Sequence, residues 1–462
     1  MSEWPDLLAR VAQIVAADRD RIESRPVDAS ASLDELRAAF GGPVPATGTG
    51  ALALIEEIAA AAAPGVVASA GPRYFGFVIG GSHPAALAAD WLTSGWDNNI
   101  GLYVAGPAPA VMEEVAGRWM VELLGLPPES SVGFATGATM ASFSGLAAAR
   151  HRVLADTGWD VEADGLQGAP RLRVIVGAER HATIDVALRY LGIGAGTVEV
   201  VPVDGQGRMA TGELAGVLAA GEPGPTIICA QAGNVNTGAA DPFGEICDLA
   251  AEIGAWVHVD GAFGLWAAAT DDLTAQVAGA ARADSWSVDA HKWLNVPYDC
   301  GVVVCRHPAD HRAALGVEAA YLVQGGAGAP RDGLDWAPEF SRRGRGVPVY
   351  AAIRALGRDG IARVVSGCCA HARRFAAALG SEPGVEILND VVLNQVLVRF
   401  DDSDDRTRAV IDGVQADGTC WAGGTVWQGR AAMRISVSNW TTTETDVDQS
   451  VAAMLRVHQS LG

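Results

Sequence analysis

The chain has 462 residues, 49% of them hydrophobic and 19% charged, and its formal net charge at pH 7 is −21. This composition argues against disorder, and the length suits two or three domains that share a large core. The negative charge, without any basic run, argues against nucleic acid or an anionic membrane surface as a partner.

The N-terminus and the cysteines bear on where the protein works. The first residues form an amphipathic helix pattern without a basic start, and no uninterrupted apolar run reaches ~18 residues. The seven cysteines form no CxxC pair and lie mostly in apolar runs, which predicts reduced core thiols rather than disulfides or a zinc site. We therefore expect a cytoplasmic protein that binds no membrane and no metal.

Three regions follow one another along the sequence. Residues 1–71 are Ala-rich and helical in pattern, and they predict an N-terminal arm that packs on a second domain or a partner subunit. Residues 72–330 alternate short apolar runs with helical stretches, which is typical of an α/β domain whose mostly parallel sheet is covered on both faces. Residues 331–462 predict a loop and a smaller C-terminal α+β domain.

Individual elements can be placed by residue number. Apolar residues at a four-residue spacing predict a helix at 111–125, and a second helix is expected at 143–154. A Gly-rich loop is expected at 325–333, with a helix resuming at 348–357. The expected strands are 171–176, 226–229, 255–260, 301–305, 385–388, 395–400 and 433–437.

Lys292 is the only lysine among the 33 lysine and arginine residues of the chain. Arginine stays protonated and is a poor nucleophile, whereas a desolvated lysine amine condenses with an aldehyde. A single retained lysine between His291 and Trp293 therefore indicates a residue that forms a Schiff base. The alternative is a biased composition with one incidental surface lysine.

An aspartate ends a predicted strand 32 residues before this lysine, an interval with room for one helix and one strand. Asp260 closes the run Trp256-Val-His-Val-Asp, and the carboxyl ends of parallel strands face the crevice where α/β sheets bind ligands. In enzymes that use pyridoxal 5′-phosphate, such a carboxylate pairs with the ring nitrogen and keeps it protonated, which makes the ring an electron sink. Asp260 and Lys292 together predict a pyridoxal phosphate site.

A turn of small residues supplies a candidate phosphate site. Gly137, Ala138 and Thr139 lead into the helix expected at 143–154, where backbone N–H groups and the helix N-terminus attract an anion. His291 can add a further donor. An ordinary capped helix start is the alternative interpretation of this turn.

Two further motifs follow predicted strands. His181 follows the strand at 171–176, and its imidazole suits stacking over a pyridine ring or acid–base chemistry near neutral pH. Asn234 and Asn236 follow the next strand, where an amide can bond the phenolic oxygen of the ring; the sequence leaves open which of the two does so.

The order of these motifs resembles a known enzyme family. The phosphate turn and His181 are followed by Gly233-Asn-Val-Asn-Thr-Gly, then by His258-Val-Asp-Gly-Ala, and finally by Asp289-Ala-His-Lys-Trp-Leu-Asn-Val-Pro-Tyr-Asp-Cys-Gly. This order is similar to that of the group II pyridoxal-phosphate-dependent amino acid decarboxylases, such as the aromatic-L-amino-acid, glutamate and histidine decarboxylases. The resemblance extends from Pro72 to Thr442 and so covers nearly the whole chain.

The resemblance implies a fold-type I structure of the aspartate aminotransferase type and a homodimer with active sites at the subunit interface. It implies that Lys292 carries the cofactor, that Asp260 pairs with the ring nitrogen and that His181 stacks on the ring. The cofactor-binding residues are expected to be Gly137, Ala138, Thr139, His181, Asn234, Asn236, Asp260, Ala262, His291 and Lys292. The substrate-binding residues are expected to be Phe77, His83, Trp96, Asn98 and Tyr103, with the segment 98–103 reaching the site of the other subunit.

Two positions depart from the family pattern. Val235 stands where the family usually has a threonine beside the cofactor, so hydrogen bonding to the cofactor must be redistributed. Gly333 stands where we count the loop tyrosine that protonates the substrate carbon in these decarboxylases, and the nearest loop tyrosine is Tyr321. Family members without that tyrosine resemble aldehyde synthases, which decarboxylate and oxidatively deaminate.

The leading hypothesis is decarboxylation of an aromatic or apolar L-amino acid. Its alternatives are decarboxylation with oxidative deamination, transamination or elimination on the same scaffold, and a non-catalytic role as a cofactor-binding partner. The aromatic residues near the expected pocket, among them Phe75 and Trp91, favour an apolar substrate but are equally suited to core packing. An acidic substrate would need an arginine, for which Arg73, Arg345 and Arg434 are candidates.

Overall fold

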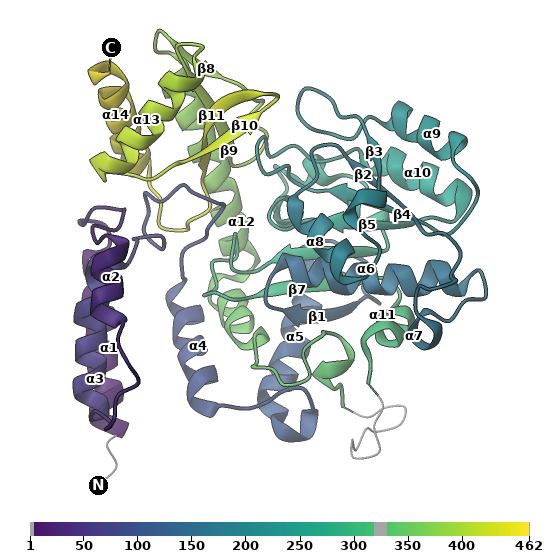
Figure 1. Ribbon diagram of the computed structural model, residues 1–462, viewed down its shortest axis with the longest axis horizontal. Coiled ribbons are helices and arrows are strands. Elements are labelled where there is room, and N and C mark those ends of the chain that lie inside the picture. The colour runs from purple at the N-terminus through teal and green to yellow at the C-terminus, as the bar shows by residue number, and fades with distance from the viewer. Residues whose placement is uncertain (1–3, 318–329, 462) are drawn as a thin grey trace.

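The chain folds into a helical N-terminal arm, a large α/β part and a smaller C-terminal α+β part (Figure 1). The structure is a computed structural model that describes residues 4–317 and 330–461. The arm consists of α1 (Trp4–Arg21), α2 (Leu33–Phe40) and α3 (Ala51–Ala62), and α4 (Pro84–Trp96) leads from it into the large part. No helix in the described ranges is both long and apolar enough to span a bilayer.

A seven-stranded sheet forms the centre of the large part, in the order β1-β7-β6-β5-β4-β2-β3. β7 runs antiparallel to both of its neighbours, and the remaining pairings are parallel. This arrangement confirms the expected mostly parallel sheet. The strands are β1 (Ser131–Ala135), β2 (Arg173–Gly177), β3 (Glu199–Val201), β4 (Thr226–Gln231), β5 (Trp256–Asp260), β6 (Ser285–Asp289) and β7 (Gly301–Cys305).

Burial on both faces explains the continuous apolar runs of these strands. Every residue of β4, β5, β6 and β7 is buried, because helices cover both faces of a parallel sheet. The long helix α6 (Ala138–Ala155) contacts β5, β6 and β7. The other helices of this part are α5 (Pro107–Leu123), α7 (Val161–Asp164), α8 (Ala182–Tyr190), α9 (Thr211–Ala220), α10 (Phe243–Ile253) and α11 (Pro308–Leu315).

The C-terminal part is a four-stranded antiparallel sheet in the order β10-β11-β9-β8. The helix α12 (Gly346–Gly380) joins it to the large part, with a non-helical backbone at Gly357, where the expected helix ended. Its other elements are β8 (Val385–Ile387), β9 (Gln395–Phe400), α13 (Asp404–Asp417), β10 (Gly423–Trp427), β11 (Arg430–Ser436) and α14 (Glu444–Ser460).

Some expectations about single elements were wrong. The interval between Asp260 and Lys292 holds the expected strand, β6, but three short 3-10 helices in place of the expected regular helix; the last of them begins after Gly279, whose backbone is left-handed. β1, β3 and β10 were not expected; β3 is three residues long and β10 is only partly buried, so neither gives a strong apolar signal. The loop expected at 325–333 lies mostly outside the described residues, and its end forms the 3-10 helix Gly333–Asp335.

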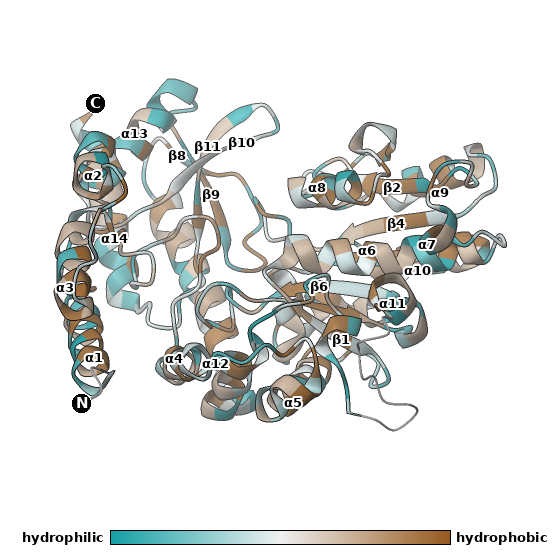
Figure 2. Cartoon of the chain, turned by 60° about the horizontal axis from the view of Figure 1, so that its bottom comes forward, coloured by the Kyte–Doolittle hydropathy of each residue, from teal (hydrophilic) through white to brown (hydrophobic). Residues whose placement is uncertain are grey.

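The N-terminal arm stands beside the rest of the chain and buries none of its helical residues (Figure 1). Apolar residues are exposed along α1 and α3, where the hydropathy view shows hydrophobic colours (Figure 2). Trp4 is 67% exposed and Leu8 is 57% exposed. A helical face this apolar is typical of a surface that another protein surface covers.

Candidate active site

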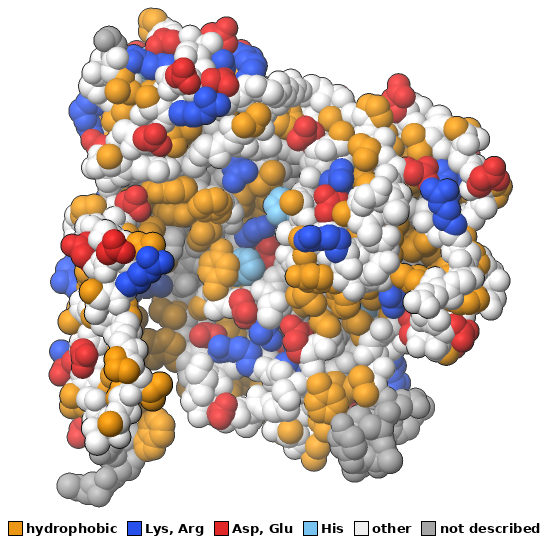
Figure 3. All heavy atoms as spheres, in the orientation of Figure 1, with side chains coloured by type: hydrophobic (Ala, Val, Ile, Leu, Met, Phe, Trp, Pro, Cys, Tyr) orange, Lys and Arg blue, Asp and Glu red, His pale blue; other side chains and the backbone are white. Residues whose placement is uncertain are grey.

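A cavity of about 190 Å³ opens at the carboxyl ends of β4 and β5, the edge at which open α/β sheets bind ligands. In the space-filling view, histidine and basic side chains meet in a hollow on the displayed face (Figure 3). The residues that line the cavity are Phe77, Val78, Gly137, Ala138, Thr139, His181, Thr183, Gln231, Gly233, Val235, Asp260, Ala262, Phe263, Asp289, His291 and Lys292. The structure therefore brings together most of the residues expected to bind the cofactor.

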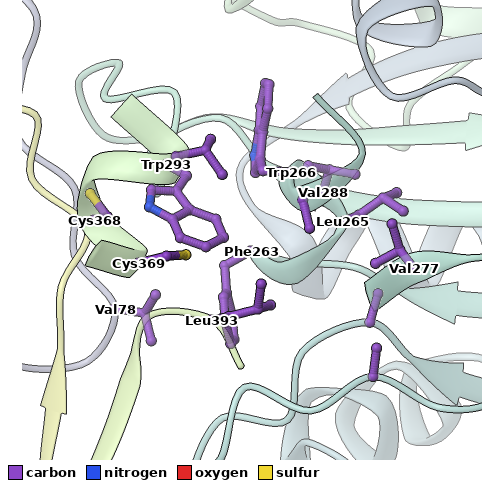
Figure 4. Close-up of a cluster of buried hydrophobic side chains, with 14 of the residues drawn as sticks. Val78, Phe263, Leu265, Trp266, Val277, Val288, Trp293, Cys368, Cys369 and Leu393 are labelled. Carbon is purple, nitrogen blue, oxygen red and sulfur yellow. The ribbon is translucent and has the colours of Figure 1, made fainter. Parts of the chain in front are cut away.

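Lys292 lies three residues beyond β6, and its amine lines the cavity. Nζ is 2.9 Å from Oδ2 of Asp289, the last residue of that strand. The neighbouring Trp293 points into the core, where its ring lies near Cys368, Cys369 and Phe263 (Figure 4). Burial of this large ring fixes the turn that carries the lysine, and the lysine side chain is left on the cavity side.

Asp260 ends β5 and is 5% exposed. Its Oδ1 accepts a hydrogen bond of 3.2 Å from the backbone N–H of Ala262. Within the described part of the chain, no cationic side chain lies within 4 Å of this carboxylate. A buried acid that faces a cavity without a paired cation fits a ligand that brings a positive charge, as the protonated ring nitrogen of pyridoxal phosphate does.

The N-terminus of α6 forms the part of the cavity expected to hold a phosphate. Gly137, Ala138 and Thr139 all line the cavity there, and small side chains leave the backbone N–H groups accessible. The N–H of Ala138 already donates to Oδ1 of Asp289 at 2.6 Å, and Nε2 of His291 is 3.5 Å from the same oxygen. A phosphate would therefore share this corner with a carboxylate that the sequence reasoning did not assign to the site.

The two histidines of the cavity are held in different ways. His181 caps α8, and its Nδ1 lies 3.3 Å from the N–H and 2.7 Å from Oγ1 of Thr183. Burial lowers the pKa of His181; the charge of Asp260 acts to raise this pKa, and the charge of Lys292 acts to lower it. Burial also lowers the pKa of His291, although Asp289 acts in the opposite direction. Both imidazoles therefore favour the neutral form at pH 7, and a neutral ring stacks on a cationic ring without charge repulsion.

Neither of the two candidate asparagines lines the cavity. Asn234 is fully buried and closes its own loop, since its Oδ1 accepts from the N–H groups of Asn236 and Thr237. Oδ1 of Asn236 accepts from Oγ1 of Thr425 at 2.9 Å. The backbone between them turns Val235 toward the cavity instead, so the geometry does not support the expected amide contact with the ring oxygen.

Of the residues expected to bind the substrate, only Phe77 lines the cavity. His83 caps α4, and its ring centre is 5.1 Å from that of Trp440. Trp96 is exposed at the end of α4, and Asn98 lines a separate surface hollow beside Arg342 and Arg343. Tyr103 also lies outside the cavity of its own chain, in a 3-10 helix whose first N–H bonds Asp332.

Gly333 is buried where no larger side chain fits. A Cβ atom there would lie 2.5 Å from the carbonyl oxygen of Ile100 and 2.6 Å from Nη1 of Arg342. The neighbouring N–H of Leu334 donates to the carbonyl of Gly101 at 3.0 Å, so this backbone is tied to the segment 98–103. A glycine at 333 is required by packing, and its presence carries no information about the missing tyrosine. Tyr321 lies outside the described residues.

Sequence reasoning missed several residues of the cavity wall, among them Asp289, Thr183 and Gln231. Asp289 could have been found, because it ends a strand three residues before Lys292 and the carboxyl ends of neighbouring strands meet at one edge. Gln231 pairs in register with Asp260 across β4 and β5, which only the sheet order reveals. Of the three arginines considered from the sequence, Arg434 is the one whose charge acts on His181.

A large α/β part with a lysine and an unpaired buried aspartate at one sheet edge defines an enzyme of the pyridoxal phosphate class. The model of the pyridoxal-dependent decarboxylase conserved domain matches residues 35–401, and the chain belongs to this family. It is accordingly a pyridoxal-phosphate-dependent lyase, and pyridoxal 5′-phosphate is its cofactor.

Individual relatives agree with this assignment. The chain is 27% identical over 441 residues to tryptophan decarboxylase 1 of Oryza sativa subsp. japonica, covering 88% of this chain and 83% of the relative. It is 25% identical over 407 residues to aromatic-L-amino-acid decarboxylase of Bacillus atrophaeus, with 86% and 82% covered. The crystal structure of Oryza sativa TDC with PLP and tryptamine superposes with a TM-score of 0.92 at 23% identity over 99% and 98% of the two chains. The fold is therefore fold-type I, as expected.

Proposed function

We propose that the enzyme removes the carboxyl group of an aromatic L-amino acid as carbon dioxide and releases the amine. The observation that carries this proposal is the pairing of Lys292 and Asp260 in one cavity whose mouth is aromatic. Phe77 lines the cavity and is tilted against Trp421 with a ring separation of 5.4 Å, and Trp421 stacks on Tyr74 at 5.0 Å. Aromatic faces of this kind bind a flat apolar side chain.

The residues around the cofactor have separable roles in this reaction. The bound cofactor supplies the electron sink for the pair of electrons that the departing carboxyl group leaves on the α carbon. Lys292 would be the amine that carries the cofactor, and Asp260 would supply the negative charge that keeps the ring nitrogen protonated. His181 would contact the ring as a neutral imidazole, and the N-terminus of α6 with Thr139 would hold the phosphate.

Arg434 is the candidate for orienting the carboxylate of the substrate. It is largely shielded from water, and burial lowers its pKa. Its nearest polar contact in the described residues is Oδ1 of Asn236 at 3.5 Å, and no carboxylate lies within 4 Å. A guanidinium without an acid partner can bind a carboxylate in two hydrogen bonds. Arg73, in contrast, pairs with Asp446, and Arg345 pairs with Asp299.

A proton must return to the α carbon after carbon dioxide leaves. A Lys292 amine that is not bonded to the cofactor would be held 2.9 Å from Oδ2 of Asp289 and would carry a proton for this step. We assign it the role of proton donor, because of the two aspartates that line the cavity, Asp260 has to remain charged beside the ring nitrogen and Asp289 is the ion-pair partner of Lys292. Lys292 regains its proton from solvent or from the next substrate ammonium group.

Product analysis tests the proposed function. The cofactor-loaded enzyme is given a mixture of common amino acids in air, and amines, aldehydes, hydrogen peroxide and carbon dioxide are followed by mass spectrometry and a coupled peroxide assay. We expect one aromatic amine with matching carbon dioxide and no peroxide. Aldehyde with peroxide would establish oxidative deamination instead, and products that keep the carboxyl group would establish transamination or elimination. A Phe77→Ala variant should raise KM for the aromatic substrate more than it lowers kcat.

The enzyme is proposed to act as a homodimer in the cytoplasm. The exposed apolar residues of α1 and α3 support a partner surface, and seven buried free cysteines support a reducing compartment. Trp96, Asn98 and Tyr103 lie outside the cavity of their own chain and are available to a neighbouring one. Sedimentation should give twice the chain mass. Mixing inactive Lys292→Ala and Tyr103→Ala chains should restore activity in hybrid dimers; no recovery would place Tyr103 outside the site of the partner.

A further inference from the structure

Asn295 lies three residues beyond Lys292 and has a left-handed backbone with φ of 54°. It is 1% exposed, and its N–H donates to the carbonyl oxygen of Lys292 at 3.1 Å. Residues other than glycine adopt this backbone region rarely, asparagine more readily than most, and such strain persists only where the surrounding structure holds it. The strained residue therefore closes the turn that carries the lysine.

The side chain of Asn295 is bonded to two segments far away in the sequence. Its Oδ1 accepts from the N–H of Gly81 at 2.6 Å and from the N–H of Trp440 at 3.1 Å. Its Nδ2 donates to the carbonyl of Ser438 at 3.1 Å and to that of Trp293 at 2.9 Å. One carboxamide thus ties the lysine turn to the N-terminal end of α4 and to the C-terminal part.

Backbone packing closes the same junction from the other side. The carbonyl of Asn295 accepts from the N–H of His83 at 2.7 Å. A Cβ atom on Gly80 would lie 1.9 Å from the carbonyl oxygen of Lys292, so the two backbones are in direct contact. The main chain of Lys292 cannot shift toward Gly80, and its turn cannot open without breaking the bonds of Asn295.

We propose that Asn295 is a positioning residue that fixes Lys292 for bond formation with the aldehyde of the cofactor. The inference rests on the proposed role of Lys292. Through Asn295, the position of the lysine depends on the packing of the segments 81–83 and 438–440 against the lysine turn. Binding of the cofactor to Lys292 therefore requires that these three segments are packed together.

The carboxamide of Asn295 satisfies all four partners of this side chain. Two backbone N–H groups require an acceptor, and two carbonyls require donors, which a carboxamide supplies from its two ends. Asn295→Asp keeps the shape but turns both ends into acceptors, so two buried carbonyls face a carboxylate oxygen. Asn295→Asp is therefore expected to displace the lysine turn as well as to destabilise it.

Asn389 provides a matched control. It is 8% exposed, its Nδ2 donates to the carbonyls of Thr237, Asp390 and Gln395, and its Oδ1 accepts from the N–H of Leu397. In the described structure it makes no hydrogen bond with the lysine turn or with the segments 81–83 and 438–440. Asn389→Asp therefore carries the same chemical change at a buried carboxamide, without the contact to be tested.

The experiment compares wild type, Asn295→Asp and Asn389→Asp as full chains. Pyridoxal phosphate is titrated into each, capture is followed by visible absorbance of the imine, and borohydride reduction with peptide mass spectrometry confirms the bond to Lys292. Thermal midpoints are measured in parallel. We expect Asn295→Asp to need at least tenfold more cofactor for half-capture than Asn389→Asp, at thermal midpoints that fall by similar amounts.

Equal capture by the two variants would overturn the proposal. Should Asn295→Asp fail to fold, Asn295→Gly replaces it, because glycine adopts a positive φ without strain while lacking the carboxamide; normal capture by Asn295→Gly would equally overturn the proposal. A wild-type chain that captures the cofactor at Lys292 but releases no carbon dioxide would refute the proposed function and leave this test intact. Wild type without capture at Lys292 would overturn both.

Discussion

Replacing Asp260 with asparagine should separate stability from catalysis. The carboxylate is 5% exposed, accepts one hydrogen bond from Ala262 and has no cation within 4 Å among the described residues. Asparagine keeps the shape and the acceptor without the charge. Burying an unpaired charge costs several kcal/mol, more than burying a neutral amide, so the cofactor-free variant should be more stable than wild type by ~1–3 kcal/mol.

Once the cofactor is bound, Asp260→Asn is expected to be unfavourable, because the lost charge interacts with the ring nitrogen. Two unit charges ~4 Å apart at an effective dielectric of ~20 attract with ~4 kcal/mol, and this attraction is what keeps the ring nitrogen protonated. Since each ~1.4 kcal/mol is a factor of ten in rate, Asp260→Asn should lower kcat by about 10³-fold. Imine absorbance should still report a loaded Lys292.

Urea unfolding of cofactor-free protein and carbon dioxide release at saturating cofactor measure the two effects. Asp241→Asn is the control: this buried acid accepts from the N–H groups of Gln231 and Met209 at 2.7 and 2.8 Å. Its replacement leaves one N–H unpaired and should destabilise the protein by ~1–3 kcal/mol. A cofactor-free Asp260→Asn protein less stable than wild type, or a loaded one within tenfold of wild-type kcat, would refute the reasoning.

Three further predictions concern residues outside the cavity. Glu113→Ala should cost ~3–5 kcal/mol of stability, because it leaves the fully buried Arg342 unpaired, and adding Arg342→Met should recover much of it in urea unfolding. Gly333→Ala should cost ~1–3 kcal/mol through overpacking and leave the ratio of amine to aldehyde unchanged by mass spectrometry. Burial lowers the pKa of His258 and His311 to about 3. In the unfolded chain each histidine has a pKa of ~6.5, so between pH ~3 and pH ~6.5 the unfolded chain binds more protons than the folded chain. The free energy of unfolding therefore falls with falling pH by ~1.4 kcal/mol per pH unit for each of these histidines. His258→Gln should remove one such contribution.

Each of these predictions has an outcome that contradicts it. If the double variant Glu113→Ala with Arg342→Met is no more stable than Glu113→Ala alone, an unpaired buried Arg342 is not the cause of the lost stability. Aldehyde formed by Gly333→Ala would give this position a chemical role after all. A pH dependence unaffected by His258→Gln would show that this histidine is protonated in the folded chain.

The sequence alone determined the chemistry of the enzyme, because that chemistry depends on residue types in a fixed order. A single lysine, a strand-ending aspartate and a turn of small residues predicted the cofactor, and the structure places Lys292, Asp260 and Ala138 in one cavity. The strands expected at 226–229 and 255–260 agree with β4 and β5 to within two residues, for a similar reason. A fully buried strand in a parallel sheet is apolar on both faces, and that property is written in a short run of residues.

Tertiary structure decided what depends on contacts between distant segments. Gly333 was matched to a loop tyrosine by counting along the sequence, but its environment is set by Ile100 and Arg342. Ile100 is more than 200 residues away in the sequence, and Arg342 is within ten residues. Asn234 has the right chemistry for a cofactor contact, yet its Oδ1 accepts from its own loop and its Nδ2 donates to the carbonyl of Glu179. The bonds of Asn295 to residues 81 and 438–440 left no trace in local sequence, because hydrogen bonding across a folded interior has no period along the chain.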